Sequence, residues 1–352
     1  MKIAILGDVH IGVRGDSLAF HELNSKFYKE VFFPYLVQHG ITAVFQLGDL
    51  FDRRKYISFQ SLALSRKYFF DEFVRHDIKL HVLLGNHDIT FKNTLEVNSP
   101  ELLLKDYNNS VFIYNEPASW QGIDIIPWIC RDNEQDIREF IYESKNQLCF
   151  GHFELQGFEM DRGNICHDGM DPSILSKYDL VFSGHFHHKS TQGNITYVGT
   201  PTEMTWSDYN DERGFHIFDT ETRELTFIEN PYRMFYKIKY NDDNLFYDDI
   251  VNDDYSKYTG KYVKIVVEKR NNSFLFDTLI DSLNKTNPTD VSIVEDFSEI
   301  DIENSDLVVD EAQDTLSILN SYVDSLTLPV ESGKIKEILR DVYTEALTTE
   351  NA

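Results

Sequence analysis

Short apolar runs alternate with amphipathic stretches from the first residues of this chain. KIAIL, AVFQL and LHVLLG are strand-like, and the stretches at 18–38 and 60–76 between them repeat apolar residues at helical spacing. This order predicts an α/β fold in which two sheets pack on each other and are flanked by helices. More strand-like runs follow before residue 230: VFIY, IDIIPW, QLCFG, LVFSG, ITYVG, GFHIFD and LTFIEN.

The pattern changes after Pro231. The strand-like runs MFYKIKY and KYVKIVVEKR are followed by the amphipathic stretch SFLFDTLIDSLNK and by a third run, VSIVED. This order is typical of a small βαβ-type module. We therefore expect a large domain at 1–230 and a small α+β domain at 231–296.

The C-terminal part is first acidic and then helical in pattern. The stretch at 297–314 is rich in aspartate and glutamate and has no lysine or arginine, which is typical of a solvated linker. Amphipathic helices are predicted at 308–326 and 332–348, and they make up most of a helical segment at 315–352. Such a pair is too small to fold alone, so we expect it to dock on its own chain or on a partner.

Bulk composition narrows the class of protein. No apolar run reaches the roughly 18–20 residues that cross a bilayer, and MKIAILGDVH turns polar too early for a signal peptide. The three cysteines are an odd number without CxxC spacing, which argues against a disulfide framework and against a thiolate zinc site. We therefore expect a cytoplasmic protein without membrane association. The net charge of −26 argues by itself against nucleic-acid binding, because phosphates are bound mainly by lysine and arginine.

Five short stretches share one pattern, in which an apolar strand runs into glycine or aspartate and then into a residue that can bind metal. They are ILGDVH, LGDLFD, LLGNHD, CFGHFE and FSGHFHH. Loops at the carboxyl ends of strands carry the sites of open α/β folds, so five strands could direct these side chains to one rim. The candidate ligands are Asp8, His10, Asp49, Asn86, His152, His185 and His187.

The chemistry of these side chains indicates a metal centre. A mixture of carboxylate, amide oxygen and imidazole suits Mn, Fe or Zn better than Ca or Mg alone. Seven ligands are too many for one ion, but they suit two ions about 3.5–4 Å apart that share a carboxylate and activate water for phosphoester displacement. In the extended run VFSGHFHH, alternation should direct His185 and His187 to the same side, with Phe186 and His188 turned away.

Taken singly these stretches are weak signals, since an aspartate such as Asp8 could equally cap a helix. In order, however, DVH, GDLFD, GNHD, GHFE and GHFH resemble the five signature segments of the calcineurin-like metallophosphoesterase superfamily. The resemblance implies a four-layer α/β/β/α sandwich with a dinuclear site. Asp8, His10, Asp49 and His187 would hold the first metal, and Asp49, Asn86, His152 and His185 the second, with Asp49 as the bridge.

The resemblance also assigns catalytic roles to two residues. His87 resembles the histidine of the superfamily that is not a ligand and that protonates the leaving oxygen or stabilises the transition state. Asp88 would orient the His87 imidazole.

Further segments resemble the SbcD-type DNA nucleases of this superfamily. These segments are IIPW, YVGTPTEMTWSD and ERGFHIFD, and the module at 231–296 resembles the capping domain of such nucleases. The length is similar to that of the compact recombination endonuclease subunits of T-even-type bacteriophages, for which the compartment would be the host cytoplasm. The acidic linker and terminal helices match in position the segment that grips the coiled-coil base of an SbcC-type ABC ATPase.

This branch implies a Mn²⁺-dependent DNA phosphodiesterase, with Mg²⁺ as the other candidate ion. It would act as a 3′ to 5′ exonuclease on duplex DNA and as an endonuclease on single strands or hairpins, as a homodimer within a heterotetramer with the ATPase. Archaeal and eukaryotic relatives have histidine at the position of Asp52, so the balance of the two activities stays open. The alternatives are a small-substrate phosphodiesterase or phosphomonoesterase, and a metal-binding scaffold that does not cut.

The acidic net charge does not exclude this function. Two divalent ions would neutralise Asp8 and Asp49, and the linker carries much of the remaining acidity. Two basic groups are either solvated surface charge or phosphate contacts: Arg53, Arg54 and Lys55 after the second motif, and Lys261, Lys264, Lys269 and Arg270 in the second domain. The helix at 60–76 is either an interface or simply core packing. The isolated chain should bind DNA weakly, and a partner and dimerisation would supply further contacts.

Overall fold

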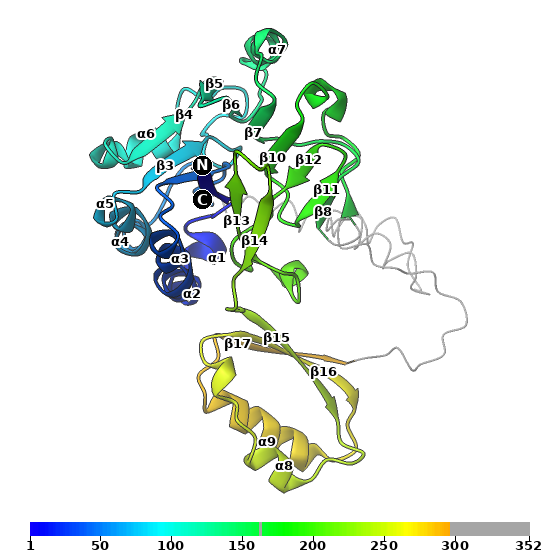
Figure 1. The fold of residues 1–352 in the computed structure, drawn as a ribbon. Coiled ribbons are helices and arrows are strands. Elements are labelled where there is room, and N and C mark those ends of the chain that lie inside the picture. Colours follow the sequence, from blue (N-terminus) through cyan, green and yellow to red (C-terminus); the bar gives the residue numbers. More distant parts are fainter. Residues whose placement is uncertain (162–163, 296–352) are drawn as a thin grey trace, which may run out of the picture. The chain divides into compact units, whose positions relative to one another are not determined.

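The structure, a computed structural model, describes residues 1–161 and 164–295. In these residues, two six-stranded sheets and one three-stranded sheet carry the fold (Figure 1). The predicted linker at 297–314 and helical segment at 315–352 lie outside the described residues. No helix among the described residues combines the length and apolar character needed to cross a membrane.

The first sheet has the strand order β14-β13-β1-β2-β3-β4. Strands β1 to β4 are parallel, and β13 joins β1 in antiparallel pairing. β1 and β2 are almost entirely buried, which explains why they read as continuous apolar runs. The strands are β1 (Lys2–Leu6), β2 (Ala43–Gln46), β3 (Lys79–Leu83), β4 (Val111–Tyr114), β13 (Gly214–Asp219) and β14 (Leu225–Glu229).

Two long helical stretches cover one face of this sheet. Each contains a π-helical turn between two α-helical parts, and Phe27, Phe32, Phe69 and Phe73 of these stretches are fully buried against it. The first stretch is α2 (Leu18–Phe27), η1 (Tyr28–Phe32) and α3 (Phe33–Gln38), and the second is α4 (Phe59–Ser65), η2 (Arg66–Phe70) and α5 (Asp71–Arg75). Both were predicted from apolar spacing.

The second sheet packs on the other face of the first. Its order is β11-β12-β10-β7-β6-β5. Phe150 lies with its ring centroid 5.1 Å from Phe45 of the first sheet, and Phe182 lies 4.9 Å from Phe218. The strands are β5 (Ala118–Trp120), β6 (Ile123–Ile126), β7 (Leu148–His152), β10 (Leu180–Gly184), β11 (Ser190–Gln192) and β12 (Ile195–Tyr197).

A further apolar cluster covers the outer face of the second sheet. It includes Ile137 and Ile141 of α7 (Glu134–Glu143), a helix that the sequence pattern did not predict. The layers are thus helix, sheet, sheet and helix, and the predicted α/β/β/α sandwich is confirmed. The other short elements of this part are α1 (Val13–Asp16), α6 (Ser99–Leu103), β8 (Glu159–Asp161), β9 (Asn164–Ile165) and the 3₁₀ helices η3 (Lys105–Tyr107), η4 (Pro172–Leu175) and η5 (Trp206–Asp208).

The C-terminal module has its own sheet and core. Its strands are all parallel, in the order β15-β16-β17, and residues such as Val263, Ile265 and Leu279 form a separate apolar cluster. This is the βαβ-type order expected from the sequence. Its elements are β15 (Phe235–Asn241), α8 (Tyr247–Val251), β16 (Tyr262–Lys269), α9 (Ser273–Asn284) and β17 (Asp290–Glu295).

Candidate metal centre

Five parallel strands of the two large sheets bring the predicted ligands to one edge. β1, β2 and β3 of the first sheet are followed by Asp8, Asp49 and Asn86, whereas β7 ends on His152 and β10 is followed by His185. The side chains of Asp8, His10, Asp49 and His152 are almost completely buried. The structure brings all seven predicted ligands together, and it separates most of them into two groups.

The first group consists of Asp8, His10 and His187, whose ligand atoms lie within 4.8 Å of one another. The Nε2 atoms of His10 and His187 are only 3.2 Å apart, and each lies 3.9 Å from Oδ2 of Asp8. Two imidazole nitrogens and a carboxylate oxygen thus converge on one point, as the ligands of a cation do.

The second group consists of Asp49, His152 and His185, again within 4.8 Å. Oδ1 of Asn86 lies 3.0 Å from Nε2 of His152 and 3.0 Å from Nδ1 of His185, so the amide oxygen joins the same cluster. Nδ1 of His152 lies 2.6 Å from the carbonyl oxygen of Leu47. Donation to that carbonyl leaves the lone pair of Nε2 directed at the cluster.

Asp49 lies between the two groups. Its Oδ1 accepts the backbone N–H of His87 at 2.7 Å. Its Oδ2 lies 3.8 Å from Nε2 of His10 in the first group and 3.5 Å from Nε2 of His152 in the second. One carboxylate oxygen therefore faces both groups.

The donor set fits divalent cations. Among the described residues, no lysine or arginine forms an ion pair with Asp8 or Asp49, although both carboxylates are buried. Buried carboxylates need a counter-charge, and in the described part of the chain the basic side chains paired with these two are imidazoles. Carboxylate, amide and imidazole ligands without a thiolate suit Mn²⁺, Fe or Zn²⁺.

The pKa values reflect this crowding of charge. Burial, offset only in part by His152, raises the pKa of Asp8 to about 6. Burial alone would lower the pKa of His10, but the carboxylates of Asp52, Asp49 and Asp8 outweigh it and raise this pKa to about 9. Burial lowers the pKa of His185 to about 3, which keeps that ring in the neutral form that binds metals.

The main chain at the site is held in unusual conformations. His10, Asp49 and His185 have φ values of 47°, 53° and 91°, in the left-handed region that residues other than glycine seldom adopt. Such conformations gather at functional sites. Gly48, with φ 96°, packs so closely against the His152 ring that a Cβ atom there would overlap it.

The geometry of FSGHFHH differs from the expected extended run. The chain turns at His185, so strict alternation does not hold, yet both rings reach the cluster and enter different groups. Phe186 is buried, with its ring centroid 4.6 Å from that of Tyr197 and 5.0 Å from that of His185. Nδ1 of His188 lies 2.9 Å from Oδ2 of Asp211, outside both groups.

His87 lies beside the first group. Its ring is edge-on to that of His10, with centroids 4.9 Å apart, and its Nδ1 lies 2.6 Å from the carbonyl oxygen of Asp52. Donation to this carbonyl fixes the ring orientation. Nε2 is then the atom through which a protonated His87 could give up a proton.

The Asp88 carboxylate makes other contacts than the expected one with the His87 ring. It accepts the backbone N–H groups of Leu50, Phe51 and Gly85, at 3.3, 3.1 and 2.9 Å. Asp88 is fully buried, and burial raises its pKa to about 7. Asp88 therefore connects the loop after the second motif to the loop after the third by hydrogen bonds. The hydrogen-bond partner of the His87 ring is the Asp52 carbonyl oxygen.

Three residues that contact the ligands were not predicted from the sequence to do so, although Asp52 was singled out for its bearing on the type of cleavage. Oδ1 of Asp52 lies 3.4 Å from Nδ1 of His10, and the Trp128 ring packs 5.2 Å from that of His185. The guanidinium of Arg213, which is 2% exposed, donates to the carbonyl oxygen of His187 and to the carboxylates of Asp208 and Asp211. Trp128 and Arg213 lie in the segments IIPW and ERGFHIFD, which resemble segments of the SbcD-type nucleases, but the resemblance assigned no role to either residue.

The fold and this site define the class. The family described as Calcineurin-like phosphoesterase matches residues 1–189, and the chain belongs to that family of phosphoester hydrolases. The chain is 35% identical to exonuclease subunit 1 of Enterobacteria phage T4 over 355 residues, which cover 98% of this chain and 99% of the relative. The expected membership of this superfamily is confirmed.

Two weaker similarities were also found. A subunit of the nuclease SbcCD of Staphylococcus epidermidis is 21% identical over 403 residues, covering 96% of this chain and 98% of the relative. A dimetal phosphatase from Danio rerio has a TM-score of 0.39 and 11% identity, covering 62% of this chain and 91% of that one.

Proposed function

We propose that this chain is the nuclease subunit of a DNA-end-processing complex. It acts as a metal-dependent DNA phosphodiesterase, with 3′ to 5′ exonuclease action on duplexes and endonuclease action on single strands and hairpins. The observation that carries the proposal is the double cluster at Asp49 in a chain similar, over nearly its full length, to an exonuclease subunit. The similarity to an SbcCD nuclease subunit adds support.

Each of the seven predicted ligands has a role in this proposal. Asp8, His10, Asp49 and His187 would hold one Mn²⁺, and Asp49, Asn86, His152 and His185 would hold the other. When bound, the two ions supply a nucleophilic water and charge stabilisation for phosphodiester displacement. Asp49 would serve both ions, since its Oδ2 faces both groups.

His87 completes the chemistry proposed for this site. Its backbone N–H fixes Asp49, and its Nδ1 is bound to the Asp52 carbonyl. A protonated His87 then donates from Nε2 to the leaving oxygen.

The test is Mn²⁺-dependent release of nucleotides from a 3′-labelled duplex by the full-length chain. The His87→Asn variant should lower kcat by about 10²–10⁴-fold, the usual contribution of a general acid. Its Mn²⁺ binding, measured by calorimetry as two ions per chain, should stay unchanged. The matched control is His39→Asn, an exposed histidine remote from the motifs. Full activity in His87→Asn would remove the proposed role, and hydrolysis of small phosphodiesters but not DNA would favour the small-substrate alternative.

The partner is an SbcC-type ABC ATPase with a coiled coil, held through the C-terminal segment at 315–352. The support is the similarity to subunits of two-component nucleases. The full-length chain should copurify with such an ATPase, whereas a chain that ends before residue 315 should not. Equal copurification of both forms would show that the helical segment is not the attachment.

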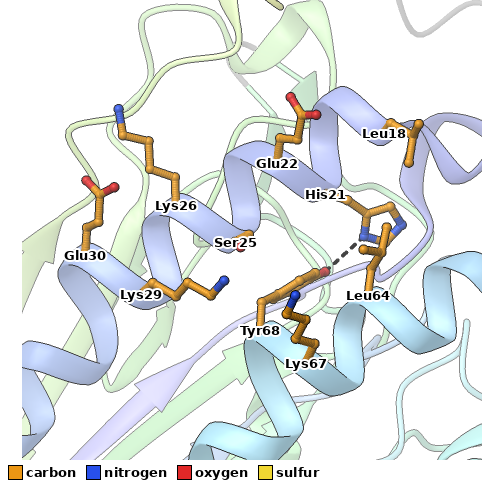
Figure 2. A pocket seen from close by; sticks show the side chains of 10 residues that line it. All are labelled: Leu18, His21, Glu22, Ser25, Lys26, Lys29, Glu30, Leu64, Lys67 and Tyr68. Carbon is orange, nitrogen blue, oxygen red and sulfur yellow. Dashed lines mark hydrogen bonds between the residues drawn. The ribbon is translucent and has the colours of Figure 1, made fainter.

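The groove between α2 and the α4–η2 stretch is a candidate surface for the contact between two copies of this chain in the heterotetramer. Figure 2 shows this groove, of about 410 Å³, in which the buried His21 is bound to Tyr68. Charges of both signs surround an apolar floor, which suits a two-fold interface that pairs each patch with itself. The charged residues are Glu22, Lys26, Lys29, Glu30 and Lys67.

Sedimentation equilibrium with full-length chain tests this surface. Lys67→Glu should weaken dimerisation, because it opposes a new negative charge to Glu22 and Glu30 of the second copy. Lys145→Glu, at an exposed lysine outside the groove, is the control. A wild-type chain that stays monomeric alone and with the ATPase would contradict the dimer.

A further inference from the structure

A cavity of about 400 Å³ opens between α2, the segment that leads into β15 and the loop at 256–261 of the C-terminal module. Its volume falls within the range of about 300–1,000 Å³ that suits small-molecule ligands. Leu23 and Pro231 give it an apolar part, and Ser256 and Thr259 contribute hydroxyl groups. The cavity therefore suits a small ligand with both polar and apolar groups.

Two walls of this cavity are held together by packing and by hydrogen bonds. Phe20 and Leu23 of α2 form one buried apolar cluster with Met234 and Phe235. The buried carboxylate of Glu203 accepts the backbone N–H groups of Met234 and Phe235, at 2.6 and 3.0 Å. Because α2 and the start of β15 are fixed to each other in this way, little conformational freedom is lost when a ligand binds between them.

The loop at 256–261 forms the third wall. It begins with the 3₁₀ helix η6 (Ser256–Tyr258) and turns at Gly260, whose φ of 67° lies in the left-handed region that glycine adopts readily. After this turn, the backbone N–H of Lys261 donates to the carbonyl oxygen of Tyr258 at 3.0 Å. The turn thus fixes the main chain from which the Lys261 side chain extends.

The lining of the cavity is positively charged in a strongly acidic chain. Among the lining residues Glu22 is the one acid, whereas the whole chain has a net charge of −26. Arg233 pairs with Glu229 at 2.5 Å, but the three lysines form no ion pair with any residue that the structure describes. The basic lining residues are Lys26, Lys257, Lys261 and Arg233. One cavity thus collects three ammonium groups without carboxylate partners in the described part of the chain.

Lys261 is the most enclosed of these lysines. Its side chain is half-buried, whereas Lys26 and Lys257 are exposed. Burial and the nearby charge of Lys26 lower the pKa of Lys261, although Glu203 and Glu22 oppose this. An anion in the cavity would relieve the repulsion between the lysines. A recessed ammonium group is more accessible to a terminal phosphate, which can enter a cavity, than to a phosphate inside a duplex backbone.

We propose that this cavity binds a terminal phosphate, as carried by a mononucleotide or by the 5′ end of a DNA strand, on Lys26, Lys257 and Lys261. Lysine binds phosphate as a compact charge with three hydrogen-bond donors. The bound phosphate would join α2 to the C-terminal module, since its partners come from both. The inference goes beyond the proposed nuclease function and does not depend on it, because none of the predicted metal ligands lines this cavity.

Calorimetry with thymidine 5′-monophosphate, on the full-length chain in EDTA and low salt, tests the site without metal. The wild type should bind the monophosphate and not thymidine. Lys261→Met, which keeps an unbranched apolar stem and removes the charge, should weaken binding by about 10- to 150-fold, the usual effect of losing a hydrogen bond to a charged group.

A second variant and a control make this result independent of folding. Lys257→Ala, at an exposed position, should also weaken binding of the monophosphate. Lys26 is left unchanged in this test, because it also borders the groove between α2 and the α4–η2 stretch (Figure 2). Lys285→Ala, at an exposed lysine of the same module outside the cavity, is the matched control and should bind as the wild type does.

Two single-stranded oligonucleotides that differ only in a 5′-phosphate or a 5′-hydroxyl distinguish the sources of the phosphate. Their binding is measured by fluorescence anisotropy in EDTA. A preference for the phosphorylated strand that is lost in Lys261→Met assigns the cavity to strand ends, and binding of the monophosphate without this preference assigns it to free nucleotides. Binding that does not depend on phosphate in either experiment would overturn the inference, and so would wild-type affinity in both lysine variants.

The wild type assayed in parallel for Mn²⁺-dependent DNA cleavage keeps the two proposals apart. Cleavage without phosphate binding in EDTA rejects the phosphate site alone. Phosphate binding that is lost in the lysine variants, in a chain that does not cleave DNA, rejects the nuclease function alone.

Discussion

Arg213 is a buried cation that holds the main chain of a predicted ligand without touching its ring. It binds the carbonyl oxygen of His187, the Thr200 hydroxyl and two carboxylates, and Asp211 in turn binds His188. Hydrogen-bonded partners of this kind fix the direction of a ligand. The precision of the site therefore depends on residues distant in sequence from the motifs.

Replacing Arg213 should therefore lower the affinity of the site for metal. Arg213→Lys keeps the positive charge but cannot serve the carbonyl and both carboxylates at once, and we expect Mn²⁺ affinity to fall by about 10- to 100-fold. Calorimetry on the purified variant measures this. Arg138→Lys, at an exposed arginine paired with Glu134 on α7, is the control and should bind Mn²⁺ as the wild type does. Unchanged affinity in Arg213→Lys would show that the arginine serves folding only.

Among the strands and loops, the predictable parts are those set by local pattern. KIAIL and AVFQL form strands because both faces of β1 and β2 are covered. The common location of the ligand-bearing loops was predictable from the same strands, because the carboxyl ends of parallel strands lie at one edge of a sheet. The turn at His185, the partners of Asp88 and the arrival of Arg213 beside His187 depend on contacts between distant segments, which no local pattern contains.

The contact between the two large sheets contains a buried histidine that links stability to pH. The His81 ring stacks 4.4 Å from that of Phe45, its Nδ1 lies 2.8 Å from the Tyr114 hydroxyl, and burial lowers its pKa to about 4. The unfolded chain, with an ordinary pKa of about 6.5, binds this proton more readily. The contribution of His81 to stability is therefore complete above pH 6.5 and is lost as the pH falls toward 4.

Urea unfolding of wild type and His81→Phe across this pH range isolates the effect. The wild type should lose up to about 3 kcal/mol more than the variant between pH 7 and pH 4, since each pKa unit corresponds to about 1.36 kcal/mol. His76→Phe, at a more exposed histidine on the outer helical layer, is the control. Parallel stability curves for wild type and His81→Phe would contradict the prediction.

For the molecule as a whole, a net charge of −26 must be reconciled with a polyanionic substrate. Arg53, Arg54 and Lys55 gather beside the site, so the local field differs from the average. Three phosphate contacts would give a slope of about −2.7 for log K against log salt. Anisotropy with the isolated chain should therefore show DNA affinity falling about 40-fold between 50 and 200 mM salt, and a salt-insensitive affinity would exclude these contacts.

The ligand residues come from both large sheets, with Asp8, Asp49 and Asn86 on one and His152 and His185 on the other. A pair of bound ions would thus act as a cross-link between sheets that also pack through an apolar layer around Phe150 and Phe182. By thermodynamic reciprocity, whatever loosens that layer must also weaken metal binding, and metal must raise the melting temperature of the sandwich. Chelation should then lower the stability of the folded sandwich as well as remove its chemistry.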